Sequence, residues 1–269
     1  MNSAPQINHL NLETINNALL SFLGVGFDYE DASILEDVSL TVDRGEFVAL
    51  VGPSGCGKST ILNLISGVLE ARSGSITASG LSNRADRLGK VSYMQQKDLL
   101  LPWRSVAENS RLGLELRGVS NSESSTAVEK LAESFGIADE LDSMPWQLSG
   151  GMRQRVALLR AVLPDNPVLL LDEPFGALDA ITRSSLQQWL LNVLDTSNKA
   201  VVLVTHDVDE AILLADRVLV MSSNPGQISA EVKIDLDASP HDASVSTSSE
   251  FIELKKHILD LLGDHEVTQ

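Results

Sequence analysis

Hydrophobic residues along the chain form short apolar runs, separated by longer stretches in which they recur at helical spacing. The run Phe47–Val51 contains no polar residue and is bounded by turn-forming residues. Runs of this kind are typical of strands that are buried on both faces of a sheet. We predict six strands from the pattern, at residues 19–26, 38–42, 47–51, 168–171, 200–204 and 217–221, with the last of them ending the core.

Helical spacing marks several of the segments between these strands. Residues 128–135 place their apolar side chains on one helical face, and the region 97–160 as a whole is predicted to be mostly helical. Further helices are predicted at residues 59–69, 153–163, 209–215 and 251–262. Strands that alternate with helices favour an α/β fold with a mainly parallel sheet.

Polar segments delimit the folded part of the chain. Residues 1–18 are polar and rich in asparagine, and we interpret them as a loose extension. Residues 238–249 are rich in serine, aspartate and alanine, a composition typical of a linker. We therefore predict one folded domain over residues 19–236, followed over 237–269 by the linker and a C-terminal helix.

Charge and cysteine content restrict the classes of function. The chain has 20 basic and 37 acidic residues, for a formal charge of −17, which disfavours binding to the phosphate backbone of a nucleic acid. Its single cysteine, Cys56, excludes an intramolecular disulfide. Residues 1–6 do not resemble the start of a secretory signal, and no apolar run approaches the length of a membrane-spanning helix. We therefore expect any membrane association to depend on a partner protein.

A phosphate-binding loop is predicted directly after the strand at 47–51. Its pattern is Gly, four residues, Gly, Lys and then Ser or Thr, formed here by Gly52, Pro53, Ser54, Gly55, Cys56, Gly57, Lys58, Ser59 and Thr60. Glycine allows the backbone angles that turn amide groups toward a phosphate, and the following helix directs its N-terminus at the same anion. We expect Lys58 to contact the β- and γ-phosphates and the Ser59 hydroxyl to ligate Mg²⁺.

Two acidic residues follow the apolar run at 168–171. A carboxylate at the C-terminal end of a parallel strand can reach a metal ion on a bound phosphate. We therefore assign Asp172 to Mg²⁺, through water, and Glu173 to the general base that polarises the attacking water. Considered alone, the pair fits equally well with an acidic residue that caps the next turn.

A third motif lies at Leu148–Met152, just before the helix predicted at 153–163. Ser149, Gly150 and Gly151 would form a serine cap with flexible glycines, which by itself is a frequent helix start. The exposed amides of such a helix end could also bind a phosphate. Because the phosphate-binding loop has its own helix, this would be a second phosphate site.

These motifs, in this order, resemble those of the ABC ATPase family. Leu148–Met152 resembles the family signature, which usually has Gln in place of Met152, although Met also occurs in the importer branch that this chain resembles. The resemblance extends from Leu19 to Leu236. It implies a P-loop ATPase with a mixed sheet, a small antiparallel β subdomain near the N-terminus and a helical lobe inserted over about 97–160.

The resemblance also implies ligands and partners. The family binds ATP and Mg²⁺, and two copies pair head to tail, so that Ser149–Gly151 of one copy faces the phosphate-binding loop of the other. We therefore expect a homodimer, two integral-membrane permease subunits and, indirectly, a periplasmic or lipid-anchored solute-binding protein. The expected location is the cytoplasmic face of the plasma membrane, through the permease, and no nucleic acid is expected as a partner.

Two further positions resemble nucleotide contacts of the family. Tyr29 resembles the aromatic residue that stacks on adenine, with Phe27 as the alternative. Gln96 resembles the glutamine that contacts Mg²⁺ and the attacking water, and its spacing to the following Leu-Pro-Trp sequence favours it over the adjacent Gln95.

Two landmarks complete the resemblance on the C-terminal side of Glu173. Asp179 ends the segment Phe175–Asp179, which resembles the family's D-loop. His206 resembles the switch histidine that bonds the γ-phosphate. The resemblance therefore implies Glu173, His206 and Gln96 as the catalytic residues.

The segments Leu99–Trp103 and Asn224–Gly226 resemble the importers of nitrate, sulfonates, taurine and thiamine precursors. They favour an ATP-hydrolysing subunit that energises the import of a small solute. The alternative is a non-transport ABC ATPase that drives or regulates another protein complex.

Two questions about single side chains stay open at this level. Trp103 and its leucine neighbours are apolar for a loop, so Trp103 either docks a permease or belongs to the core. The thiol of Cys56 is either a reactive thiolate within the phosphate-binding loop or a buried, inert group.

Overall fold

The computed structural model of the chain describes residues 18–30, 32–236 and 245–263. The extension predicted over 1–18 therefore lies outside the described residues except for Ala18, as does the part of the predicted linker from 238 to 244. Within the part of the chain that is described, every helix is too short or too polar to traverse a bilayer.

The larger of two sheets carries four of the six predicted strands, those at 47–51, 168–171, 200–204 and 217–221, and the strands predicted at 19–26 and 38–42 belong to the smaller sheet. The order of the larger sheet is β5-β6-β7-β3-β8-β9, and all neighbouring strands are parallel except β8 and β9. Its strands are β3 (Phe47–Val51), β5 (Ser92–Met94), β6 (Val168–Asp172), β7 (Ala200–Val204), β8 (Arg217–Ser222) and β9 (Gln227–Lys233). The mixed α/β fold predicted for the chain is confirmed.

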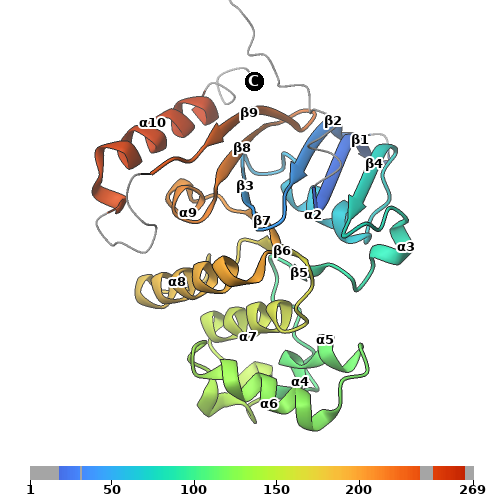
Figure 1. Ribbon diagram of the computed structural model, residues 1–269, viewed down its shortest axis with the longest axis vertical. Helices are drawn as coiled ribbons and strands as arrows, with labels where there is room; N and C mark the ends of the chain where they lie inside the picture. The colour runs from blue at the N-terminus through green and yellow to red at the C-terminus, as the bar shows by residue number, and fades with distance from the viewer. Residues whose placement is uncertain (1–17, 31, 237–244, 264–269) are drawn as a thin grey trace, which may run out of the picture.

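A smaller antiparallel sheet lies to one side of the large one (Figure 1). Its order is β2-β1-β4, formed by β1 (Leu20–Tyr29), β2 (Ala32–Val42) and β4 (Ser73–Ala78). A parallel bridge between Leu35 and Gly226 joins β2 to the segment that connects β8 and β9. This sheet is the antiparallel subdomain that the family resemblance implied.

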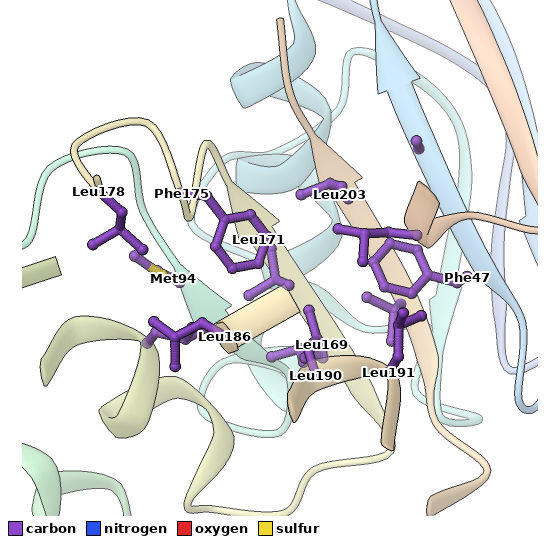
Figure 2. Close-up of a cluster of buried hydrophobic side chains, with 14 of the residues drawn as sticks. Phe47, Met94, Leu169, Leu171, Phe175, Leu178, Leu186, Leu190, Leu191 and Leu203 are labelled. Atoms are coloured by element: carbon purple, nitrogen blue, oxygen red, sulfur yellow. The ribbon is translucent and has the colours of Figure 1, made fainter. Parts of the chain in front are cut away.

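Hydrophobic residues on alternate positions of each central strand enter two different cores. In β3, Phe47, Ala49 and Val51 pack into one cluster, while Val48 and Leu50 pack into the other. The first cluster fills the space between the large sheet and the helices α7 to α10, and Figure 2 shows its part around α8. The second joins the large sheet to α2 and the antiparallel sheet. Burial on both faces explains why the central strands are continuous apolar runs.

The helices are distributed over three regions of the fold (Figure 1). α2 (Lys58–Ser66) and α3 (Arg84–Arg87) lie near the antiparallel sheet, and α4 to α7 form a lobe at the far end of the molecule. The lobe helices are α4 (Val106–Ser110), α5 (Leu112–Glu115), α6 (Asn121–Ala132) and α7 (Gly150–Val162). The remaining helices are α8 (Ala180–Ser197), α9 (Val208–Leu214) and α10 (Ser249–Gly263).

Several predicted boundaries are wrong. α7 begins at Gly150 rather than Arg153, because Ser149 caps the helix by accepting a hydrogen bond from the Met152 amide. α2 ends at Ser66 rather than Leu69, because Gly67 adopts a left-handed conformation with φ of 85°. The segment predicted as a linker contains the short 3-10 helix Val245–Thr247 and the first residue of α10.

The strand β9, which was not predicted, contradicts the expectation that residues 217–221 end the core. β9 pairs antiparallel with β8 at the sheet edge, and most of its side chains are at least partly exposed. An edge strand of this kind lacks the continuous apolar run by which the central strands were found. The strands β4 and β5 and the helix α8 were likewise not predicted.

Candidate functional site

The loop Gly52–Thr60 connects the end of β3 to α2. Gly57 has φ of 100°, and a Cβ atom there would lie 2.6 Å from a methyl carbon of Leu35, so only glycine fits. The N-cap of α2 is Gly57, and no side chain caps this helix, whereas a side chain caps α7. The first-turn amides of α2 are therefore available to an anion, which is the arrangement that binds a phosphate.

Lys58 points back across this loop. Its Nζ donates hydrogen bonds to the carbonyl oxygens of Gly52 at 2.7 Å and Pro53 at 2.8 Å. Its Nζ also lies 3.7 Å from the sulfur of Cys56. The ammonium group is thus held inside the curve of the loop, where it can exchange carbonyl partners for phosphate oxygens.

The Cys56 side chain is buried beside Lys58. It is only 1% exposed and packs in the apolar cluster between α2 and the antiparallel sheet. Because the sulfur is shielded from solvent, the structure favours the buried, inert group over the reactive one. Only the backbone of Cys56 is left to contact a ligand in the loop.

Asp172 ends β6 next to the phosphate-binding loop. Its carboxylate is buried and accepts a hydrogen bond from the Ser59 hydroxyl. Burial raises the pKa of Asp172, the charge of Glu173 raises it further, and the Ser59 hydrogen bond and the Lys58 charge oppose the rise. A cation placed here would offset the cost of the buried negative charge.

The oxygen atoms at this position fit Mg²⁺, which prefers hard oxygen ligands and keeps several waters or phosphate oxygens. Ser59 and Asp172 supply a hydroxyl and a carboxylate, and Gln96 adds a carboxamide nearby. Among the described residues, no group of three or more His, Cys, Asp or Glu side chains could hold a metal by itself. The donors therefore suit a metal ion that shares its coordination with a phosphate-bearing ligand.

Three predicted catalytic side chains meet at the C-terminal edge of the large sheet. Gln96, Glu173 and His206 follow β5, β6 and β7, which are adjacent and parallel. Gln96 Nε2 donates a hydrogen bond to Glu173 Oε2 at 3.1 Å, and His206 Nδ1 lies 3.4 Å from Glu173 Oε1. Each oxygen of the Glu173 carboxylate therefore has its own neighbour, and Gln95 makes no comparable contact among the described interactions.

A buried polar pair, Thr205 and Glu210, stabilises the loop that carries His206. The Thr205 hydroxyl donates to Glu210 Oε2 at 2.8 Å and accepts from the Asp207 amide at 3.0 Å. Burial raises the pKa of Glu210, and the hydrogen bond from Thr205 works against the rise. Asp207 in turn caps α9 through the amides of Asp209 and Glu210. The side chain of His206 itself is exposed to solvent.

Tyr29 and Phe27 differ in exposure. Phe27 is buried, whereas Tyr29 is 48% exposed at the end of β1, and their rings meet edge to face at 4.7 Å. Phe27 thus belongs to the core and supports Tyr29 from one side. Of the two, Tyr29 has a ring that is open to a planar ligand.

Ser149 to Gly151 lie at the start of α7, in the helical lobe. Ser149 and Gly150 are exposed, and the Ser149 hydroxyl accepts from the Met152 amide at 3.2 Å. Figure 1 places the start of the lobe helix α7 apart from α2. Asp179, exposed at the start of α8, accepts from the Thr182 amide at 3.0 Å, and that hydrogen bond lowers the pKa of Asp179. Neither motif is joined to the phosphate-binding loop within one chain by a described interaction.

Sequence reasoning missed residues that hold the segment after Gln96. Arg153 Nε donates to Asp98 Oδ2 at 3.0 Å, and Arg153 Nη1 donates to the Leu148 carbonyl at 2.9 Å. Arg160, on the same helix, donates to the carbonyls of Asp98 at 2.5 Å and Leu99 at 2.9 Å. The only sign of them in the sequence is their position: Arg153 directly follows the motif Leu148–Met152, and Asp98 lies two residues after Gln96.

Gly226 is a second residue whose importance depends on tertiary structure. A Cβ atom at this position would lie 2.1 Å from the Cys56 carbonyl oxygen and 3.0 Å from that of Ile34. The segment Asn224–Gly226 therefore packs against the back of the phosphate-binding loop, where no larger residue fits.

Comparison with known proteins places the site in a wider context. A sequence profile of a family described as ABC transporter matches residues 35–176. A taurine import ATP-binding protein of Yersinia pseudotuberculosis is 39% identical over 248 residues, which cover 90% of this chain and 96% of the relative. An aliphatic sulfonates import ATP-binding protein of Burkholderia cenocepacia is 44% identical over 214 residues, covering 80% of this chain and 77% of the relative.

A solved structure has the same fold. It is an ATP-binding cassette, described as a dimer in a post-hydrolysis state bound to ADP and Pi. Its TM-score is 0.74 at 29% sequence identity, and the match covers 80% of this chain and 99% of that cassette.

Proposed function

Because this chain belongs to the ABC transporter family, we propose that it is the ATP-binding and ATP-hydrolysing subunit of an importer for a small solute. The observation that carries the proposal is the meeting of Gln96, Glu173 and His206 beside the Ser59–Asp172 pair. This arrangement combines a phosphate-binding loop, a metal site and a general base at one edge of the sheet.

Each group has a defined task in this proposal. Lys58 and the first-turn amides of α2 hold the phosphates of ATP, and Tyr29 stacks on the adenine. Ser59, Asp172 and Gln96 hold Mg²⁺, which when bound neutralises charge on the phosphate oxygens. Glu173 accepts a proton from the attacking water, and the water oxygen bonds to the γ-phosphorus as the bond from that phosphorus to the ADP oxygen breaks, which releases ADP and inorganic phosphate.

His206 and Gln96 have orienting roles. His206 hydrogen-bonds the γ-phosphate, and its position beside Glu173 keeps that phosphate close to the base. Gln96 holds the other oxygen of Glu173 and connects it to the segment that leads to Trp103. The state of the γ-phosphate can therefore be passed toward the surface through Gln96.

We further propose a head-to-tail homodimer. The exposed start of α7, with Ser149, Gly150 and Gly151, is a second phosphate-binding helix end that would serve the ATP on the partner subunit. The related cassette is described as a dimer, which supports the pairing of two subunits. Asp179, exposed at the start of α8, would lie in the same interface. Because each subunit supplies the missing part of the other's site, the dimer has twofold symmetry.

The domain organisation follows from the same proposal. We propose that residues 19–236 form the ATPase domain, with the helical lobe over about 97–160, and that the helix α10 lies C-terminal to it. Two permease subunits would hold the dimer at the cytoplasmic face of the membrane, with a periplasmic or lipid-anchored solute-binding protein acting through the permease.

The two relatives narrow the class of solute. They are named for taurine and aliphatic sulfonates, which are small organic sulfonates. We propose a solute of this class or of the related nitrate and thiamine-precursor types. The solute would bind the permease and its binding protein, so the residues of this chain do not select it.

Phosphate release by the purified chain tests the ATPase. With MgATP, we expect the rate per subunit to rise with protein concentration, because the complete site requires two chains. A Lys58→Met variant purified in parallel measures contaminating ATPase. A rate equal to that of Lys58→Met at all concentrations would contradict the proposal. If the alternative of a non-transport ATPase holds, the active protein should co-purify with a soluble complex rather than with a permease.

Trp103 is the proposed contact for the permease. It is 70% exposed, so it does not belong to the core, while the neighbouring Leu100 is buried and anchors the loop. The buried Asn109 holds the loop further, because its side chain bonds the backbone of Leu101, Arg104 and Ser105. An exposed Trp on a fixed loop is typical of a protein interface.

We therefore expect Trp103→Ala to weaken permease association by about 30-fold or more, because hot-spot residues contribute at least about 2 kcal/mol. Thermal stability and ATP affinity of the isolated subunit should be unchanged. Co-purification and solute uptake in vesicles measure the effect, with Ile252→Ala on α10 as a control that also removes an exposed apolar side chain. Unchanged association, or a large loss of stability in the isolated subunit, would contradict the docking role.

A further inference from the structure

Gln154 connects the start of α7 to the backbone of Glu173. Its side chain is buried on α7, two positions after Met152. Its Nε2 donates a hydrogen bond to the Glu173 carbonyl oxygen at 2.7 Å, and its Oε1 accepts one from the Ala177 amide at 2.8 Å. Both ends of the carboxamide thus form a hydrogen bond. If the group were reversed, its NH2 would face the Ala177 amide and its oxygen would face the Glu173 carbonyl, so neither bond could form.

The backbone that Gln154 holds is unusual. Glu173 has φ of 50°, a left-handed conformation that non-glycine residues adopt only when the surroundings require it. Its amide donates to the Val204 carbonyl at 2.8 Å, which continues the pairing of β6 with β7. Gln154 therefore holds the opposite, carbonyl side of the same residue. Together these two contacts determine where the Glu173 carboxylate points.

The start of α7 and the segment after Glu173 are also in close backbone contact. A Cβ atom on Gly151 would lie 3.3 Å from the Ala177 carbonyl oxygen. A change in the position of Ser149–Gly151 is therefore transmitted to residues 173–177 by the backbone contact at Gly151 and by the carboxamide of Gln154. A side chain that only filled space would not need a donor and an acceptor in these positions.

We propose that Gln154 is a positioning residue for ATP hydrolysis, which keeps Glu173 directed at the attacking water and makes this position depend on the start of α7. This inference rests on the proposed function, in which Glu173 is the base and Ser149–Gly151 bind the partner subunit's ATP. Contact with that ATP would fix the position of α7, and α7 would in turn fix the position of Glu173 through Gln154. The base of one site is then aligned only when the other site is occupied.

The first test is Gln154→Leu, which keeps the volume and removes both hydrogen bonds. We expect kcat for ATP hydrolysis to fall about 10- to 100-fold, the range that follows from misplacing a catalytic group. KM for ATP should change little, because the two hydrogen bonds go to Glu173 and Ala177 and not to the phosphate-binding loop. Gln187→Leu on α8 removes another buried glutamine and should leave kcat unchanged.

The pH dependence of kcat in Gln154→Glu tests the hydrogen bonds of this side chain, and a loss of packing alone would not change it. When ionised, this side chain can accept from Ala177 but cannot donate to the Glu173 carbonyl. When protonated, it has both a donor and an acceptor, as Gln does, and burial favours the protonated form. We therefore expect the ratio of variant to wild-type kcat to rise as the pH is lowered. Taking the ratio removes the pH effects that the variant and the wild type share.

A double-variant cycle separates this inference from the proposed function. Once Glu173 is replaced by Gln, adding Gln154→Leu should lower the residual rate little further. Normal turnover in Glu173→Gln would overturn the role of Glu173 itself. A slow Glu173→Gln with normal turnover in Gln154→Leu would overturn only the positioning role. If Gln154→Leu does not fold, a ratio of Gln154→Glu to wild-type kcat that does not change with pH would equally overturn the positioning role.

Discussion

Replacing Glu173 with glutamine should lower kcat for ATP hydrolysis about 10²- to 10⁴-fold, the usual contribution of a general base. The amide oxygen of Gln can still accept the hydrogen bond from Gln96, so the geometry should persist while the proton acceptor is lost. ATP binding should be retained, because Lys58, Ser59 and Asp172 are untouched. Because the proposed dimer encloses ATP between its two subunits, a variant that binds ATP without hydrolysing it should accumulate as an ATP-bound dimer.

Steady-state phosphate release and light scattering with and without MgATP measure these two effects. Glu253→Gln on α10 is a matched control, because it makes the same chemical change at an exposed position remote from the site. Turnover of Glu173→Gln close to that of Glu253→Gln would remove Glu173 from the role of base. A slow variant that stays monomeric with MgATP would instead contradict the proposed dimer.

Replacing Arg87 with methionine should lower the free energy of unfolding by about 3–5 kcal/mol. Arg87 is only 4% exposed, and its guanidinium donates to the carbonyls of Leu64 and Ile65 near the end of α2, Ile76 in β4, and Ser82. Burial and the nearby charge of Arg84 lower the pKa of Arg87. Methionine keeps the apolar stem but leaves the buried carbonyls without this donor.

The midpoint of urea unfolding measures this loss, provided that the slope of the transition is unchanged. Arg84→Met is the control, because Arg84 lies on the same short helix but is exposed, where it donates to the carbonyls of Gly67 and Val68 and pairs with the exposed Glu70. Arg87→Lys should also be destabilised, because an ammonium group cannot reproduce the planar set of donors. Equal midpoints for Arg87→Met and Arg84→Met would show that the guanidinium contacts are unimportant.

The central strands could be predicted because their burial leaves a direct mark on the sequence. Residues 47–51 and 200–204 are buried on both faces, and the apolar runs match β3 and β7 at both ends. β9 leaves no such mark, because it lies at an edge and its side chains are partly exposed. The start of α7 was misplaced because two glycines after Ser149 resemble a loop, whereas the serine cap makes them the first helical residues.

The candidate site likewise has parts that a local sequence pattern predicts and parts that depend on the tertiary structure. A local pattern determines the phosphate-binding loop, because its function depends on consecutive backbone angles and on the helix that follows. The carboxylates at the end of β6 were also predictable, because a strand end directs them to one edge of the sheet. The convergence of Gln96, Glu173 and His206, however, depends on the strand order β5-β6-β7, since the three residues follow three different strands.

The sequence by itself determined the family resemblance, the acidic charge and the residues that we propose to face phosphate and metal, because each of these depends on composition or on a short run of neighbours. Only the tertiary structure decided that Cys56 is buried, that Trp103 is exposed and that Tyr29, rather than Phe27, is open to a ligand. It alone also revealed that Gln154 holds Glu173. Burial and hydrogen-bond partners depend on segments distant in sequence, and no local pattern records which of them the fold brings together.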